Sequence, residues 1–167
     1  MSSRNVGTVT TRSPQEPEWR TTETVGTTNL DRVAWTELDT YSTPVRGSLT
    51  VVESGHGIPF ALKRIFYIYG TTSDSERGAH AHRESCQGFI AVKGSFSLEL
   101  TDSHQKKTYV LSKPNRALFV PAMVWARLYD FSSDAICLVL ADSLYDPADY
   151  VREWDEYVAL IANGESA

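Results

Sequence analysis

The sequence predicts an all-β protein, a single antiparallel β-barrel or jelly roll that carries one C-terminal α-helix and a flexible N-terminal extension. From Trp35 onward, short segments rich in β-branched and aromatic residues are separated at regular intervals by Gly, Pro, Asp and Ser. Many short strands divided in this way are typical of sandwiches and barrels rather than of parallel α/β sheets. The chain has 167 residues, of which 41% are hydrophobic, and this composition suits one domain with a single core.

Residues 1–34 differ in composition from the rest of the chain. They are rich in Thr and Ser and show no apolar period, so we expect a flexible extension outside the packed core. Residues 35–146 are predicted to form the barrel. The expected strands are 49–53, 60–69, 79–82, 88–92, 96–101, 108–111, 117–120, 125–130 and 135–141.

Residues 147–163 are predicted to form one helix. Asp146 suits the position before a helix, Pro147 suits the first helical position, and Asn163-Gly164 suits the end. An apolar stripe at helical spacing is expected to pack on the outside of the barrel. The residues of this stripe are Tyr150, Trp154, Val158 and Ile161.

The bulk composition argues against several classes of protein. No apolar run approaches the ~20 residues that a membrane span needs, and the N-terminus has no hydrophobic signal region. We therefore expect a cytoplasmic protein without a membrane partner. Cys86 and Cys137 are too few for a disulfide framework.

Charge is distributed unevenly along the chain. Residues 44–127 contain eleven Lys and Arg against six Asp and Glu, whereas residues 128–167 contain one against nine. A basic barrel with a concave pocket favours an anionic small-molecule ligand. Nucleic acid is not expected as a partner, because no Lys/Arg run or nucleic-acid motif accompanies the charge. The alternative is a set of scattered, solvated surface charges.

The segment from Arg77 to His82 is the strongest candidate for chemistry. His80 and His82 are two residues apart, and in a strand such residues share one face. Two neighbouring imidazoles can bind a metal, act as an acid/base couple near neutral pH, or form a buried polar pair.

The spacing of His80, His82, Gln87 and Gly94 resembles the first motif of the cupins, which are small antiparallel barrels. The resemblance implies that metal-binding cupins have a carboxylate at the place of residue 87 and a third histidine at the place of residue 125. Here these positions hold Gln87 and Trp125. A neutral amide is a weak ligand for transition metals and an indole N–H only donates, so we expect no metal or other cofactor.

The chain as a whole resembles the sugar 3,4-ketoisomerases, which are RmlC-like cupins acting on dTDP-4-keto-6-deoxyglucose. About 110 residues carry the resemblance, and the combination with Gln rather than a carboxylate at position 87 is specific. The matching positions are Arg46 to Leu49, Glu53, Pro59-Phe60, Lys63 to Gly70, Arg77 to His82, Gln87, Gly94-Ser95, and Tyr145 to Arg152.

This resemblance implies proton transfer beside a ketone, through an enediol, without redox chemistry. His80 and His82 are then the base and its partner, in either order. Arg77 and Tyr67 are candidates for stabilising the oxyanion, and Gln87 for orienting a histidine. The resemblance also implies a homodimer and a dTDP-linked 4-keto-6-deoxy sugar as ligand. Candidates for binding this substrate are Gln87, Arg46, Lys63, Arg64 and Trp125.

Three other functions fit parts of the same pattern. A nucleotide-sugar epimerase of the same fold also abstracts a proton beside a ketone, but it would place a base and a donor on opposite faces of the sugar. A non-catalytic cupin would bind the nucleotide sugar without turnover. A metal-dependent oxygenase is disfavoured by Gln87 and Trp125.

Overall fold

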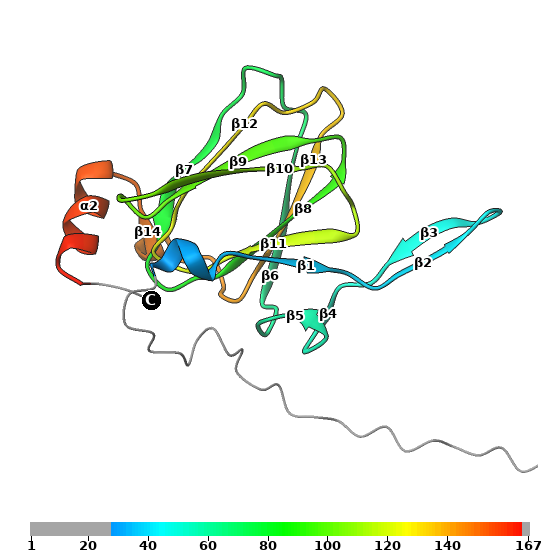
Figure 1. The fold of residues 1–167 in the computed structure, drawn as a ribbon, viewed down its shortest axis with the longest axis horizontal. Helices are drawn as coiled ribbons and strands as arrows, with labels where there is room; N and C mark the ends of the chain where they lie inside the picture. The colour runs from blue at the N-terminus through cyan, green and yellow to red at the C-terminus, as the bar shows by residue number, and fades with distance from the viewer. Residues whose placement is uncertain (1–27, 165–167) are drawn as a thin grey trace, which may run out of the picture.

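The computed structural model describes residues 28–164, and most of these residues form two five-stranded antiparallel sheets that face each other (Figure 1). The first sheet has the order β1 (Ala34–Glu37), β11 (Arg116–Val120), β8 (Gln87–Lys93), β13 (Ile136–Ala141) and β6 (Arg64–Tyr69). The second has the order β10 (Lys106–Leu111), β9 (Phe96–Thr101), β12 (Trp125–Tyr129), β7 (Arg77–His82) and β14 (Tyr150–Val151). The predicted all-β fold with one C-terminal helix is confirmed.

The main core lies between the inner faces of the two sheets. Because side chains alternate along a strand, Phe89 and Val139 of the first sheet point inward and pack with Leu98 and Leu128 of the second. All four side chains are buried. Burial of apolar surface at roughly 25 cal/mol per Å² makes this layer the main source of stability.

The outer face of the first sheet is also apolar. Ile90, Phe119 and Leu140 alternate with the inward side chains and pack under the segment that contains β4 (Glu53–Ser54) and β5 (Gly57–Ile58). This segment covers only part of the face. On β6, Ile65, Tyr67 and Tyr69 remain 55%, 61% and 68% exposed.

The N-terminal region is more ordered than the composition of residues 1–34 predicts. The 3-10 helix η1 (Asn29–Arg32) precedes β1, which pairs with β11. Leu30 is only 1% exposed and belongs to the main core. Residues 28–34 are therefore part of the barrel, since strand pairing and the burial of one leucine outweigh a polar composition. Residues 1–27 of the predicted extension lie outside the described residues.

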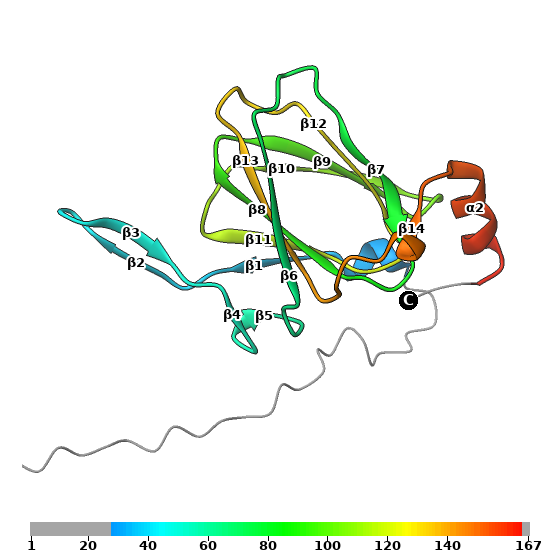
Figure 2. The ribbon, with the colours of Figure 1, turned by 180° about the vertical axis from the view of Figure 1, so that it is seen from behind.

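One hairpin projects away from the two sheets, as Figures 1 and 2 show for β2 (Thr40–Thr43) and β3 (Gly47–Thr50). Its side chains are largely exposed, including Tyr41 and Leu49. The strand expected at residues 49–53 is thus divided between this hairpin and β4.

The predicted single helix over residues 147–163 is wrong in its first half. Asp146 and Pro147 begin only the 3-10 turn η2 (Pro147–Asp149), in which the Asp146 side chain accepts a hydrogen bond from the Ala148 amide at 2.9 Å. The chain then pairs with β7 as β14 before α2 (Trp154–Ala162) begins. Hydrogen bonding between strands replaces the helix that the local signals favour.

Helix α2 packs on the outer face of the second sheet. Tyr157 is fully buried against Ala81, Met123 and Val151, and its hydroxyl donates to the carbonyl oxygens of Thr101 at 2.9 Å and Met123 at 3.1 Å. Across residues 28–164, none of the helices is long and apolar enough to cross a membrane.

Candidate active site

His80 and His82 share the inner face of β7, as their spacing predicts. Their ring centroids are 5.0 Å apart with an interplanar angle of 81°. The register of β7 against β12 shifts beside them, because Ala126 pairs with His80 but Arg127 pairs with Gly78. The extra residue in this β-bulge is Ala79, whose φ of 54° lies in the left-handed region. Such strained, re-aimed backbone is frequent beside functional groups.

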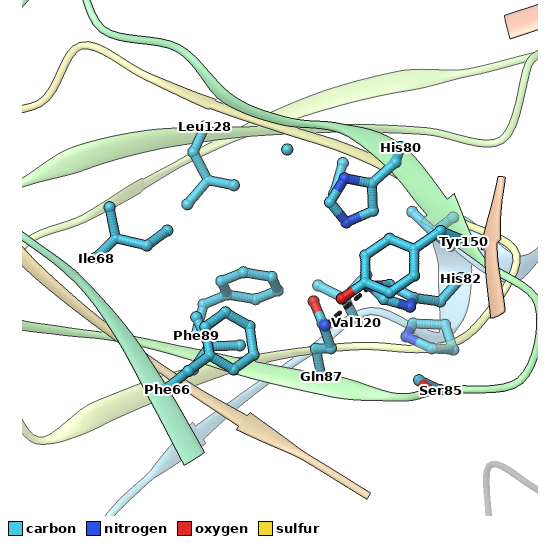
Figure 3. Close-up of a pocket in the computed structure, with 15 residues that line it drawn as sticks. Phe66, Ile68, His80, His82, Ser85, Gln87, Phe89, Val120, Leu128 and Tyr150 are labelled. Carbon is cyan, nitrogen blue, oxygen red and sulfur yellow. Dashed lines mark hydrogen bonds between the residues drawn. The ribbon is translucent and has the colours of Figure 1, made fainter. Parts of the chain in front are cut away.

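The two histidines line a cavity of about 100 Å³ between the two sheets. Apolar side chains from both sheets form most of the wall, among them Phe66, Phe89 and Leu128. The polar groups gather at one end (Figure 3). They belong to His80, His82, Ser85, Gln87 and Tyr150.

His82 is held by hydrogen bonds at both ring nitrogens. Its Nδ1 lies 2.7 Å from Oδ2 of Asp149, and its Nε2 lies 3.0 Å from Nε2 of Gln87. An ionised carboxylate can only accept, so Nδ1 carries the proton in the neutral ring. Nε2 is then the acceptor, and the Gln87 amide nitrogen donates to it. The two partners together select one tautomer of His82.

Asp149 is itself fixed by several donors. Oδ1 accepts from the Glu84 amide at 2.8 Å, and Oδ2 accepts from the Ser85 hydroxyl at 2.5 Å. The Ser85 hydroxyl also contacts that of Ser143. The Asp149 carbonyl oxygen accepts from the Arg83 amide at 2.8 Å. The turn η2 and the start of β14 are thereby joined to the loop after β7, which holds the carboxylate beside His82.

The environment keeps both imidazoles neutral at neutral pH. Burial, followed by the charge of His82, lowers the pKa of His80 from 6.5 to about 4. Burial also lowers the pKa of His82, and this effect exceeds the opposing influence of Asp149. For Asp149, burial alone would raise the pKa, but hydrogen bonds from Ser85, the Glu84 amide and His82 outweigh it and hold the pKa below its ordinary value. The site therefore contains two neutral bases and one carboxylate.

Tyr150 completes the polar end of the cavity. It is the cross-strand partner of His82 in the β14–β7 pair. Its ring centroid lies 4.4 Å from that of His82 and 4.9 Å from that of His80. Tyr150 therefore lies in the cavity, and the prediction that it belongs to an apolar helical stripe on the barrel exterior is wrong.

Several predicted site residues lie outside this cavity. Tyr67 is on the face of β6 opposite to Phe66 and Ile68, which line the cavity. Trp125 is on the outer face of the second sheet, where its ring contacts Trp154 at 5.2 Å and Tyr157 at 5.4 Å.

The predicted cationic residues are also outside the cavity wall. Arg77 is exposed, and its cross-strand partner is Leu128. Arg64 lies with its guanidinium carbon 5.7 Å from the centre of the Tyr145 ring, and its charge contributes to the lowered pKa of His82. Lys63 precedes β6, and Arg46 lies in the turn of the projecting hairpin.

Sequence reasoning missed three residues of the site, namely Ser85, Asp149 and Tyr150. Asp149 and Tyr150 lie within a stretch that resembles the ketoisomerases. This resemblance was the sequence feature that could have assigned both residues to the site. The helical interpretation assigned both to a helix instead. Within residues 28–164, no three His, Cys, Asp or Glu side chains are grouped as metal ligands.

Comparisons with known proteins show that this chain is similar to sugar 3,4-ketoisomerases. Residues 31–162 match the model of the family described as FdtA, WxcM-like, C-terminal. A TDP-4-oxo-6-deoxy-α-D-glucose-3,4-oxoisomerase from Aneurinibacillus thermoaerophilus is 38% identical over 117 residues, which cover 70% of this chain and 84% of that protein.

Two solved structures show the same similarity in three dimensions. A 3,4-ketoisomerase from Helicobacter canadensis superposes with a TM-score of 0.75 and 38% identity, covering 78% of this chain and 97% of that one. The sugar 3,4-ketoisomerase QdtA from Thermoanaerobacterium thermosaccharolyticum, in complex with TDP, superposes with a TM-score of 0.77 and 32% identity, covering 79% and 96%.

Proposed function

This chain belongs to the FdtA, WxcM-like family of sugar 3,4-ketoisomerases, and on that premise we propose that it isomerises TDP-4-keto-6-deoxyglucose to the 3-keto sugar. The observation that carries the proposal is the pair of neutral imidazoles at the polar end of an otherwise apolar cavity. The reaction removes the C3 proton, which the adjacent ketone acidifies, and returns a proton to C4. A neutral base in a water-poor site is suited to this step.

We assign the base to His80. One of its ring nitrogens is hydrogen-bonded to the Gly78 backbone, which leaves the other nitrogen for a substrate proton. His82 differs, because Asp149 and Gln87 occupy both of its nitrogens. We therefore assign His82 the role of a positioned partner that stabilises charge beside the base.

Gln87 has a specific function in this assignment. A carboxylate at that position could not donate to Nε2 of the neutral His82, whereas the amide nitrogen does so at 3.0 Å. Glutamine at position 87 therefore maintains a neutral imidazole where a metal-binding cupin would hold a ligand. The same residue can also contact the substrate from the polar end of the cavity.

The cavity limits which part of the substrate is enclosed. A water molecule accounts for roughly 30 Å³ of liquid volume, so a space of about 100 Å³ admits the reacting edge of a sugar ring. In this proposal the nucleotide diphosphate lies outside. Burial is the main cause of the lowered pKa of His82, and the positive charges of Arg64 and Arg152 add to it. Cations so placed favour an anionic group at the entrance of the cavity. Lys63 remains a candidate for the same contact.

We also propose a homodimer. Ile65, Tyr67 and Tyr69 form an exposed apolar strip on β6, which is an edge strand of its sheet. Natural proteins usually cover such edges, and a second copy of the chain would do so. Arg46 and Trp125 are not at the cavity of their own protomer, so a role for either in binding substrate would require the partner.

Proton NMR in deuterated water tests the proposed function. The wild-type protein is expected to convert TDP-4-keto-6-deoxyglucose to a 3-keto sugar that carries deuterium at C4. His80→Asn is expected to abolish both conversion and exchange at C3, since no base remains. Exchange with inversion and no movement of the ketone would instead make the protein an epimerase, and binding without any exchange would make it a binding protein.

A further inference from the structure

The turn between β11 and β12 is buried along its whole length. It consists of residues 121–124, of which Pro121 and Val124 line the cavity. Ala122 and Met123 are buried as well. A buried turn carries backbone N–H and C=O groups that water cannot reach, so other parts of the protein must supply their hydrogen bonds. The partners of these groups therefore identify the elements that hold the cavity wall in place.

Met123 has the unusual backbone conformation in this turn. Its φ of 55° lies in the left-handed region, where the Cβ atom of an ordinary residue is crowded by the neighbouring carbonyl oxygen. Such a conformation persists only where the surrounding structure holds it. Since this residue is not glycine, the turn depends on the hydrogen bonds that its backbone makes.

Three elements supply those hydrogen bonds. The Met123 amide donates to the His82 carbonyl oxygen on β7 at 2.7 Å. The Met123 carbonyl oxygen accepts from the Tyr157 hydroxyl of α2 at 3.1 Å and from the Asn29 side-chain amide of η1 at 3.5 Å. Of these two donors, Tyr157 makes the shorter bond. A series of contacts therefore runs from α2, outside the barrel, through Met123 to the backbone of His82.

We propose that Tyr157 is a positioning residue for the reaction, which acts through Met123 on His82 and on the cavity wall. This inference rests on the proposed isomerase function. The Tyr157 hydroxyl holds the Met123 carbonyl oxygen, and with it the left-handed conformation of the turn. Without the hydroxyl, the strain at positive φ favours relaxation of the turn. Relaxation withdraws the Met123 amide from His82 and displaces Pro121 and Val124 at the cavity.

Glycine at position 123 separates positioning from stability. Glycine adopts positive φ without strain, so the turn in Met123→Gly keeps its conformation with or without the Tyr157 hydroxyl. The same substitution removes a buried side chain that packs with Tyr157, and this loss lowers stability. Combined with Tyr157→Phe, the substitution should therefore restore activity while it lowers stability further.

The test compares Tyr157→Phe, Met123→Gly and the double variant. Phenylalanine retains the buried ring and removes only the hydroxyl. For Tyr157→Phe we expect kcat with TDP-4-keto-6-deoxyglucose to fall by about tenfold or more, because small displacements of reacting groups are costly. KM should change much less, and the imidazole NMR signals of His82 should shift. In the double variant, kcat should return to within about threefold of that of Met123→Gly, although the melting temperature falls below that of either single variant.

Tyr109→Phe is the matched control. This variant also loses a hydroxyl from a packed tyrosine, but Tyr109 contacts Trp35 on another part of the barrel. It should retain the kcat of the wild type and leave the His82 signals unmoved.

Two results would overturn the inference. Wild-type kcat and unmoved His82 signals in Tyr157→Phe would show that the hydroxyl positions nothing. A double variant with kcat no higher than that of Tyr157→Phe would show that activity merely follows stability. Should the double variant not fold, Met123→Asn replaces Met123→Gly under the same criterion, since asparagine tolerates the left-handed region. If the wild type does not convert the sugar, the proposed isomerase function fails, while the His82 signals of Tyr157→Phe still test the positioning.

Discussion

The Nδ1 atom of His82 lies 2.7 Å from Oδ2 of Asp149, although 66 residues separate the two in the chain. This contact exists because η2 and β14 return to the edge of β7 after the barrel is complete. It determines which nitrogen of His82 carries the proton. The contact also connects the chain segment beside β14 to the histidine pair on β7.

Asp149→Asn tests this link. An amide cannot supply the negative charge that fixes Nδ1–H of His82, so we expect kcat to fall by roughly 10²-fold. The carboxylate raises the pKa of His82, and the variant should therefore show a lower His82 pKa by NMR titration. Asp146→Asn is the control, because Asp146 only caps η2. A normal kcat with an unchanged His82 titration would refute the role of Asp149.

Gln87→Glu tests the neutral state of His82. A carboxylate 3 Å from Nε2 can only accept a hydrogen bond, so it favours the doubly protonated imidazolium. We expect the pKa of His82 to rise and kcat at neutral pH to fall by at least about tenfold. Gln105→Glu, in the exposed turn between β9 and β10, should change neither quantity. Activity equal to that of the wild type would show that the amide is not needed.

The pH dependence of kcat/KM follows from the environment of His80. The base acts in its neutral form, so activity is present above its pKa and is lost as the pH falls through it. Burial and the neighbouring His82 lower that pKa from 6.5 to about 4. We therefore expect an acid limb centred near pH 4, with folding checked by circular dichroism at each pH. A limb centred on 6.5 would mean that His80 is not the base, or that it is solvated.

The proposed homodimer predicts a solution mass about twice the chain mass of 18.6 kDa. Tyr67→Asp places a charge in the middle of the exposed strip on β6 and should give a monomer, because burying an unpaired carboxylate is costly. Val110→Asp is the matched control, since Val110 is also an exposed apolar residue, on the edge strand β10. Light scattering after size-exclusion chromatography distinguishes a monomer from a dimer for each variant. A dimeric Tyr67→Asp would place the interface elsewhere.

The local sequence pattern was sufficient to predict several strands of the barrel. The strand predicted at 96–101 coincides with β9, and those at 88–92, 117–120 and 135–141 differ from β8, β11 and β13 by one residue at one or both ends. These strands have period-two or continuous apolar patterns, which depend only on neighbours in the chain. The pair His80 and His82 was predictable for the same reason, because alternation is a local property.

Local pattern failed where partners distant in the chain decide the structure. Residues 147–151 carry good signals for the start of a helix, yet Tyr150 pairs with His82 and Asp149 accepts hydrogen bonds from the loop after β7. Leu30 likewise lies in a polar segment but enters the core. In each case the free energy of a tertiary contact exceeds the weak preference of a short segment.

By itself, then, the sequence determined the all-β class, the HxH pair on one strand face, and the ketoisomerase family, because composition, alternation and motif spacing are written along the chain. Only the tertiary structure decided that Ser85, Asp149 and Tyr150 lie around the histidines, and that Tyr67 and Trp125 face away from the cavity. The physical reason is that a side chain's partners, burial and pKa depend on which strands lie beside it, and strand order is set by packing of the whole barrel.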